Sequence, residues 1–164
     1  MAKLELDNFY DIIFQMNNHK TIGYTCGSFD LFHIGHLNIL KRAKENCDYL
    51  IVGLNSDETM LRCKNKLPVI PFNERKQILE AIRYVDKVIK VECLKPNSKA
   101  DDWDTRLKAD IVIASDECIN HPEWQELAKL KQNSNSGKIL FFPYTKTTSS
   151  TLIRKLLQDK LIDN

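Results

Sequence analysis

The sequence predicts a doubly wound α/β fold built on a parallel five-stranded sheet. Five short runs rich in Ile, Val, Leu and Phe show little polar alternation, which is typical of parallel strands covered on both faces. Helical patterns separate these runs, and repeated β-α units of this kind form doubly wound sheets. The strands are expected at Thr21–Cys26, Tyr49–Leu54, Lys87–Val91, Asp110–Ala114 and Lys138–Phe142.

Helical patterns fill most of the chain between and after these strands. In the second of them apolar residues recur at helical spacing, and Asn73 is expected to be its N-cap. A further amphipathic pattern at residues 4–17 precedes the first strand, where it would cap the sheet or join a partner subunit. We therefore expect an N-terminal helical extension (1–20) and one domain (21–164). The other helices are expected at His36–Asn46, Asn73–Tyr84, Glu123–Gln132 and Ser150–Leu161.

Composition excludes several classes of protein. With 164 residues, 43% of them hydrophobic and 28% charged, the chain is close to the average globular domain rather than a disordered or fibrous protein. A net charge of +2 without a dense Lys/Arg block argues against a nucleic-acid partner. No segment has the apolar length of a membrane span, and the N-terminus lacks a secretory leader. The five scattered cysteines form no CxxC pair, which favours reduced thiols in the cytoplasm over a zinc site.

The strongest functional signal is the segment Gly27–His36, which directly follows the first strand. Ligands of doubly wound sheets bind beyond the carboxyl ends of the strands, where the winding reverses. Gly27 lets the backbone approach a phosphate, and a helix starting near His36 offers free N–H groups and the positive end of its dipole. His33 and His36 can then both reach phosphate oxygens, while Gly35 leaves room for a nucleotide. The alternative interpretation is a pair of ordinary histidines at a helix start.

These residues carry a resemblance to a known family. GSFDLFHIGH, LNILKRAKENCDYLIVGLNSDE, KNKLPVIPFNERKQILEAIRYVDKVI and FFPYTKTTSSTLIRKLL resemble the cytidylyltransferases, most closely those that act on glycerol 3-phosphate. The resemblance covers most of residues 21–157 and leaves the N-terminal extension outside. HxGH alone is shared with adenylyltransferases and class I aminoacyl-tRNA synthetases, but the chain is far too short for a synthetase. The ERKQILEAIRYVD block favours the cytidylyltransferases.

The resemblance implies a Rossmann-like nucleotidyltransferase fold and a defined chemistry. The phosphate of an acceptor would attack the α-phosphorus of CTP in line and release pyrophosphate, without a covalent enzyme intermediate. Mg²⁺ would bridge the phosphates and keep most of its waters, so no cage of protein metal ligands is expected. The resemblance also suggests a homodimer, for which the apolar face of Phe9, Ile12, Ile13 and Met16 offers extra surface.

Site residues follow from the resemblance by position. His33, His36, Lys64 and Arg83 would handle phosphates during catalysis, with Arg75 a weaker candidate of the same kind. Solvated lysines, and an Arg83–Asp86 salt bridge, are the structural alternatives. Hydroxyls at the start of the last helix would seat the β- or γ-phosphate, although one of them is also expected to cap that helix. The expected nucleotide-binding residues are Gly27, Ser28, Phe29, Gly35, Ser115, Glu117, Thr145, Ser149 and Ser150, and the expected acceptor-binding residues are Lys66 and Trp103.

The chain departs from the family pattern in two places. Ser115-Asp116-Glu117-Cys118 stands where the family usually has Gly-Asp-Asp-Trp, in a loop near the base and the acceptor. Tyr144-Thr145-Lys146-Thr147 stands where relatives often have Arg-Thr-Glu-Gly, so a phosphate-binding arginine is replaced and Lys146 is a candidate substitute. Both departures bear on substrate choice.

We therefore expect a cytoplasmic enzyme that transfers CMP from CTP to a small phosphorylated alcohol. CTP is expected to be preferred over ATP, because Ala114-Ser115 in place of a glycine narrows the space for a base. An adenylyltransferase acting on a sugar phosphate or cofactor precursor is the main alternative. A nucleotide-binding regulatory module that has lost turnover is the other.

Overall fold

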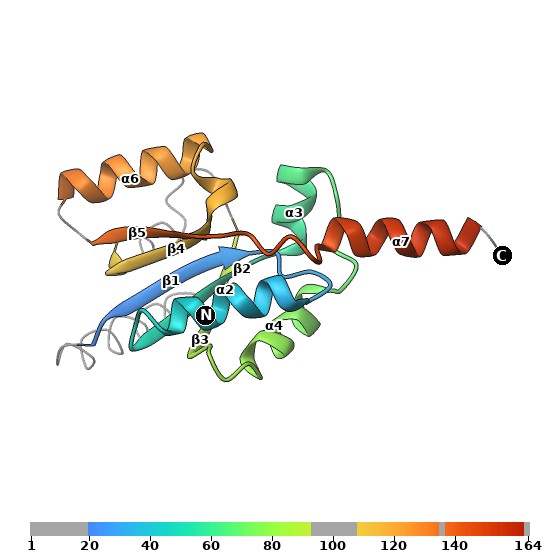
Figure 1. Ribbon diagram of the computed structural model, residues 1–164, viewed down its shortest axis with the longest axis horizontal. Coiled ribbons are helices and arrows are strands. Elements are labelled where there is room, and N and C mark those ends of the chain that lie inside the picture. Colours follow the sequence, from blue (N-terminus) through green and yellow to red (C-terminus); the bar gives the residue numbers. More distant parts are fainter. Residues whose placement is uncertain (1–19, 93–107, 135–136, 163–164) are drawn as a thin grey trace.

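A parallel sheet of five strands, in the order β3-β2-β1-β4-β5, forms the centre of the protein (Figure 1). The computed structural model describes residues 20–92, 108–134 and 137–162. The predicted doubly wound, five-stranded parallel sheet is confirmed, with every strand within one residue of its expected bounds. The strands are β1 (Ile22–Gly27), β2 (Tyr49–Asn55), β3 (Lys87–Val91), β4 (Ile111–Ser115) and β5 (Lys138–Phe142).

Helices cover both faces of the sheet. On one face, α2 (Ile34–Lys44) and α4 (Phe72–Glu80) bury Leu40 and Leu79 against the strands. On the other face, α6 (Pro122–Ser134) buries Trp124 and Leu127 against Tyr24. The last helix, α7 (Ser150–Ile162), starts beyond the carboxyl ends of the strands and projects away from the sheet (Figure 1). A short 3-10 turn, η1 (Asp116–Cys118), follows β4.

Among residues 20–92 the structure adds a helix that the sequence did not predict, α3 (Asp57–Lys64), directly after β2. Ser56 caps it by accepting a hydrogen bond from the Thr59 N–H at 3.1 Å, and two acidic residues in the first turn favour its dipole. Its only buried apolar side chain is Met60, so the segment lacks the repeating apolar stripe on which the prediction relied.

The prediction that Asn73 caps a helix reaching Tyr84 is wrong at both ends. The helix α4 begins at Phe72, after Pro71, and it ends at Glu80. The missing cap comes from outside the helix, because the Asp57 carboxylate accepts a hydrogen bond from the Phe72 N–H at 3.1 Å. Beyond Glu80 the chain forms the turn that leads into β3. In this turn the Asp86 N–H donates a hydrogen bond to the Leu50 carbonyl of β2 at 3.1 Å.

Within the described residues, no helix is both long enough and apolar enough to cross a membrane. The N-terminal extension, apart from Lys20, lies outside the described residues, and so does Trp103. The division of the chain at residue 20 therefore stays a prediction.

Candidate active site

The strand order places the Gly27–His36 segment at the reversal of the sheet. The chain winds outward from β1 to β2 and β3, then crosses to β4 and β5 on the other side. The carboxyl ends of β1 and β4 therefore flank the point where a doubly wound sheet binds its ligand. Gly27 ends β1, and Ser115 ends β4. The structure thus brings the two predicted nucleotide-binding segments to the same edge.

The turn after β1 is held in a conformation unusual for side-chain-bearing residues. Phe29 and Leu31 both have positive φ, 47° and 50°, in the left-handed region that non-glycine residues seldom adopt. Phe29 is nonetheless buried, with its ring joined to the hydrophobic core of the α2 face. Burial of the Phe29 ring offsets the free-energy cost of these positive φ angles. Asp30, between Phe29 and Leu31, points into the protein.

Asp30 connects three segments of the site, and it is only 1% exposed. Its two carboxylate oxygens accept hydrogen bonds from the N–H groups of Val69 and Ile70 at 3.0 and 2.9 Å. The same carboxylate forms an ion pair with Arg154 on α7. Its backbone carbonyl accepts a hydrogen bond from the Ser150 hydroxyl at 2.6 Å. One residue thereby joins the turn after β1, the loop after α3 and the start of α7.

His33 is both the N-cap of α2 and the outer member of the histidine pair. Its Nδ1 accepts a hydrogen bond from the Gly35 N–H at 3.0 Å. An accepting Nδ1 carries no proton, so the neutral ring has its proton on Nε2, available for a ligand. The rings of His33 and His36 stack with centroids 3.9 Å apart and planes 29° from parallel. Burial lowers the pKa of His33, which favours this neutral form.

The His36 ring lies in an aromatic setting behind His33. Its centroid is 5.2 Å from that of Phe29 and 5.5 Å from that of Phe32. The buried Nδ1 atom has no hydrogen-bond partner within the described chain. Burial, and secondarily the neighbouring His33, lower the pKa of His36 to about 4, while Asp30 acts in the opposite direction. At neutral pH the pair therefore offers hydrogen bonds rather than fixed positive charges.

This environment predicts an acid-shifted titration of His36. In the free protein its ring is expected to titrate near pH 4, whereas in the unfolded chain it takes up a proton near the ordinary value of about 6.5. Because the unfolded state binds this proton first, the group's contribution to stability falls as the pH drops from about 6.5 towards 4. Bound triphosphate should raise the pKa, since negative charge favours imidazolium. NMR titration of the ring protons with and without nucleotide measures both effects, and a midpoint near 6.5 in the free protein would contradict the assignment.

Gly35 has a more local role than the expected one of clearing space for the nucleotide. A Cβ added there would lie 2.8 Å from Cε1 of His33 and 3.6 Å from Cβ of Thr145. The glycine thus makes room for the His33 ring itself and for the segment that leads to α7. It is required for the geometry of the histidine pair before any ligand arrives.

The hydroxyl-rich segment before α7 reaches the same site. The Thr145 hydroxyl accepts a hydrogen bond from the side-chain amide of Asn38, on α2, at 3.1 Å. Ser149 accepts from the Leu152 N–H at 3.1 Å, so it performs the capping that the sequence left open. Its hydroxyl proton stays available, whereas that of Ser150 is donated to Asp30. The N-terminus of α7 therefore lies beside the turn that carries the histidines, where its free N–H groups can bind an anion.

The polar side chains of the loop after β4 bond to the loop itself and to the segment before α7. The Ser115 hydroxyl accepts a hydrogen bond from the Glu117 N–H at 3.4 Å and is directed into η1. Asp116 accepts from the Tyr144 N–H at 3.1 Å, which joins this loop to the segment before α7. Glu117 itself is exposed. The two segments that depart from the family pattern therefore contact each other.

Comparison with known proteins identifies the family. A family model described as cytidylyltransferase-like matches residues 24–156, four-fifths of the chain. The chain belongs to the cytidylyltransferase-like family. Its relatives include the glycerol-3-phosphate cytidylyltransferase of Bacillus subtilis, 34% identical over 80% of this chain and 92% of the relative. They also include the FAD synthase of Pyrococcus horikoshii, 36% identical over 72% of this chain and 77% of the relative.

Solved structures share the fold. A lipopolysaccharide core biosynthesis protein from Thermoplasma volcanium superposes with a TM-score of 0.63 and 24% identity, over 78% of this chain and all of that one. A pantoate-beta-alanine ligase from Francisella tularensis gives 0.59 and 16% identity, over 93% of this chain and 74% of that one. At these identities the likeness establishes architecture alone. It agrees with the resemblance read from the sequence, which the family match confirms.

In this cytidylyltransferase-like protein one predicted lysine ends α3, and the other lies on the exposed loop that follows, whose far end is fixed. Lys64 ends α3, and Asn65 follows in the left-handed conformation with φ of 48°. Lys66 comes next, and both lysine side chains are exposed. A few residues later the loop is anchored on Asp30 through the N–H groups described above. The lysines are therefore on the same edge of the sheet as the histidines, where a phosphate can recruit them.

Arg83 is not brought to this edge. It lies in the turn before β3, at the amino ends of the strands, where Lys44, the last residue of α2, pairs with Asp86 at 2.6 Å. The eleven residues of α2, about 16 Å long, separate that edge from the histidines. The exposed guanidinium of Arg83 bonds the Tyr84 hydroxyl at 2.9 Å rather than Asp86. Within one chain the structure does not support a place for Arg83 beside His33 and His36.

Arg75 has a structural role that the sequence did not reveal. It is 1% exposed, and its guanidinium donates hydrogen bonds to the carbonyls of Ser28, Asn55 and Ile70 at 2.6, 3.0 and 2.8 Å. It also pairs with Asp57 at 2.5 Å. The side chain therefore ties together the carboxyl ends of β1 and β2, and four of its five N–H donors are used in doing so. A direct contact between Arg75 and substrate is not supported.

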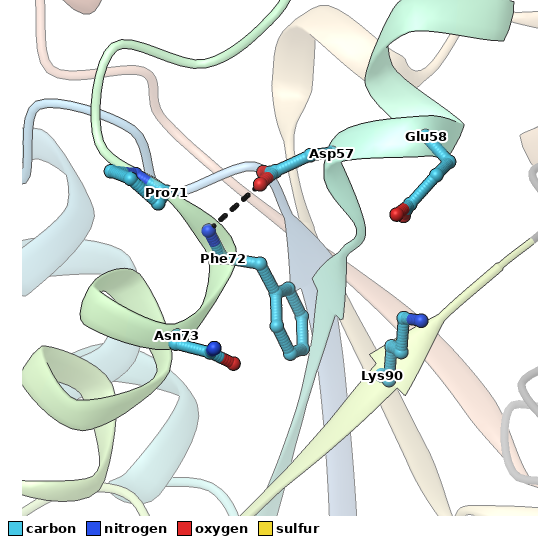
Figure 2. A pocket seen from close by; sticks show the side chains of 6 residues that line it. All are labelled: Asp57, Glu58, Pro71, Phe72, Asn73 and Lys90. Atoms are coloured by element: carbon cyan, nitrogen blue, oxygen red, sulfur yellow. Dashed lines mark hydrogen bonds between the residues drawn. The ribbon is translucent and has the colours of Figure 1, made fainter.

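A pocket of about 240 Å³ lies between the start of α3, the start of α4 and Lys90 on β3 (Figure 2). Phe72 forms part of its wall, and Glu58 and Lys90 face each other across it (Figure 2). Lys90 is already paired with Glu92 at 2.8 Å, which raises its pKa. The pocket contains none of the predicted site residues. Its lining is Asp57, Glu58, Pro71, Phe72, Asn73 and Lys90.

The described residues contain no cluster of three or more His, Cys, Asp or Glu side chains suited to a metal. The most deeply buried carboxylate of the site, Asp30, is saturated by backbone N–H groups and Arg154. The magnesium ion that the resemblance implies, held by the substrate's phosphates and by water, stays a prediction. Such an ion would supply charge neutralisation on the triphosphate.

Three residues of the site escaped the sequence analysis as functional candidates: Asp30, Asn38 and Arg154. Asp30 stood within the quoted motif, but its partners lie 39, 40 and 124 residues further along the chain. The Nε atom of Arg154 is buried without a hydrogen-bond partner in the described chain. The sequence did contain one signal for Arg154. It lies in the first turns of the last helix, five residues after the Ser149 cap, close to the segment expected to bind phosphate.

Proposed function

We propose that this protein transfers CMP from CTP to a small phosphorylated alcohol, releasing pyrophosphate and forming a CDP-alcohol. The observation that carries the proposal is the stacked, neutral histidine pair at the reversal of a cytidylyltransferase-like sheet, in which His33 Nδ1 accepts a hydrogen bond from the Gly35 N–H. The similarity to a glycerol-3-phosphate cytidylyltransferase over 80% of the chain supports the choice of nucleotide and acceptor class.

The proposed reaction is a single in-line displacement. An oxygen of the acceptor's phosphate forms a bond to the α-phosphorus of CTP, and the bond from that phosphorus to the bridging oxygen of the β-phosphate breaks. Hydrogen bonds from His33 Nε2 and from His36 stabilise the charge that develops on the phosphoryl oxygens and on the leaving pyrophosphate. Free N–H groups and the Ser149 hydroxyl at the start of α7 hold the outer phosphates, and Lys64 and Lys66 close over them.

An adenylyltransferase is the second candidate, and a specific observation favours it. FAD synthases from Pyrococcus horikoshii, Thermococcus kodakarensis and Pyrococcus abyssi are 31–36% identical to this chain over 72–80% of its length. The chemistry at phosphorus would be the same, with ATP as donor. A nucleotide-binding module without turnover is less well supported, because the histidine pair, the Gly35 contact and the α7 anchor are all intact.

CTP is expected to be the better donor. The carboxyl end of β4 carries buried Ala114 and half-buried Ser115 where a glycine would leave more space, so a purine is disfavoured. Calorimetry with CTP and ATP at matched magnesium measures the preference, which we expect to be at least about tenfold, or about 1.4 kcal/mol. Equal or tighter binding of ATP would instead favour the adenylyltransferase.

Pyrophosphate release tests the activity directly. The assay pairs CTP or ATP with glycerol 3-phosphate, with other phosphorylated polyols, and with the flavin monophosphate that adenylyl transfer would convert to FAD. Release with CTP and a polyol phosphate supports the proposal, and release only with ATP selects the alternative. No release with any pair, despite nucleotide binding, would indicate the regulatory module. The proposal also includes a cytoplasmic, magnesium-dependent homodimer.

A further inference from the structure

One side of α2 holds the segment that connects β5 to α7. Gly35, Asn38 and Arg42 are three and four residues apart, so they lie on the same face of the helix. A Cβ added at Gly35 would lie 3.6 Å from Cβ of Thr145, and the Asn38 side-chain amide donates to the Thr145 hydroxyl oxygen at 3.1 Å. The Arg42 guanidinium donates to the Pro143 carbonyl at 3.1 Å. Thr145 is therefore held in a fixed position beside the first turns of α2.

The Asn38 amide determines the direction in which the Thr145 hydroxyl forms hydrogen bonds. A threonine hydroxyl has one proton to donate and two lone pairs that accept. The Asn38 N–H occupies one of these lone pairs, and within the described residues no acceptor takes the Thr145 proton. Because an amide NH₂ group donates and does not accept, the proton is directed away from Asn38. The bond thus leaves Thr145 as a donor with a free proton.

The three hydroxyls expected to bind phosphate near the start of α7 differ in this respect. The Ser150 proton is donated to the Asp30 carbonyl at 2.6 Å, so that hydroxyl is already used. The Ser149 oxygen accepts from an N–H of its own helix and keeps its proton. Phosphate oxygens accept hydrogen bonds, so they need hydroxyls whose protons are free. Of the three, Thr145 and Ser149 have that property, and only Thr145 owes it to a side chain from another element.

We propose that Asn38 is a positioning residue that fixes the Thr145 hydroxyl as a hydrogen-bond donor to the phosphates of the bound nucleotide. The location supports this role, because a Cβ added at Gly35 would meet both the His33 ring and Thr145, so the hydroxyl lies beside the histidine pair. Asn38 acts through the Thr145 oxygen and does not contact the substrate itself. The inference rests on the proposed function for the presence of a nucleoside triphosphate, but not on the identity of the base.

Asn38→Asp tests the proposal, because it reverses the polarity of this bond at nearly constant shape. A carboxylate only accepts, so it would take the Thr145 proton. The affinity for CTP with magnesium, measured by calorimetry on the full-length chain, should fall about tenfold or more. In the pyrophosphate assay the KM for CTP should rise while kcat changes less. Asn38→Leu removes the amide without taking the proton, so its affinity should fall only about threefold.

Two controls separate the change in bonding from the added charge. In a Thr145→Val protein there is no hydroxyl proton to take, so Asn38→Asp should lower the CTP affinity further by less than about threefold. Asn46→Asp makes the same exchange just past the far end of α2, where the exposed Asn46 amide donates to the Arg42 carbonyl at 2.8 Å. It should leave the CTP affinity unchanged. Urea unfolding checks that each variant is folded.

An equal loss of affinity from Asn38→Asp with and without the Thr145 hydroxyl would overturn the inference, since the carboxylate would then act through its charge alone. Wild-type affinity in Asn38→Asp would overturn it as well. Failure of the proposed function gives a different result. If the wild type prefers ATP, or binds nucleotide without turnover, cytidylyl transfer is contradicted, while the same variants with the better-bound nucleotide still decide the role of Asn38. A wild type that binds neither CTP nor ATP would overturn both.

Discussion

Replacing His36 with Ala is expected to lower kcat by about a hundredfold to a thousandfold while leaving the fold intact. The expected size is that of removing one preorganised donor from a site where charge develops in the transition state. The His36 ring stacks on His33 at 3.9 Å, so its loss also frees the ring that holds the second donor. Binding of the ground-state nucleotide should change much less, because the contribution is made mainly as the α-phosphorus is attacked.

Thermal stability should be nearly unchanged in this variant for a physical reason. The alanine removes packing against Phe29 and Phe32, but it also removes a buried nitrogen that has no partner in the described chain. The two effects oppose each other. His121→Ala is the matched control, since His121 is exposed just before α6. A His36→Ala enzyme with near-normal kcat would show that the histidine pair is not the catalytic centre.

The sheet could be predicted because its signal is local. Each strand of a covered parallel sheet is a short apolar run, and the five runs had nearly the correct bounds. The histidine motif was also local, since His33, Gly35 and His36 are neighbours in sequence, at the N-cap and in the first turn of α2. Once a doubly wound sheet is predicted, a motif that directly follows the first strand is expected at the point where the strand order reverses.

The parts where the structure differs from the sequence analysis depend on contacts between distant segments. The cap of α4 is a carboxylate from α3, so no reading of the α4 sequence alone would place its start at Phe72. Arg75 was a candidate phosphate ligand because arginine suits that role, yet its guanidinium donates to three carbonyls, those of Ser28, Asn55 and Ile70, from three separate segments of the chain. Arg83 matched the family motif, but the turn that carries it lies at the opposite edge of the sheet.

Asp30→Asn is expected to damage both stability and activity, because the carboxylate serves partners that an amide does not satisfy. Two N–H groups and a guanidinium converge on its oxygens, and Asn offers a single acceptor oxygen together with an NH₂ group that would face a donor. Arg154 would be left without its counter-charge in a site where its side chain is 18% exposed. Removing one partner of a buried pair costs about 3 kcal/mol, measurable by urea unfolding.

The effect on catalysis separates positioning from stability. Asp30 fixes the far end of the loop that follows Lys64 and carries Lys66, and it fixes the start of α7. At a temperature where the variant is fully folded, the KM for the triphosphate should rise about tenfold or more while kcat falls less, since these segments hold phosphates. Asp48→Asn is the control, because that exposed carboxylate also accepts a backbone N–H, from Thr21 at 2.8 Å, but at the amino edge of the sheet. If Asp30→Asn and Asp48→Asn showed the same KM, the Asp30 network would be a purely structural element, and the phosphate-holding role of the two segments would have to rest on their own side chains.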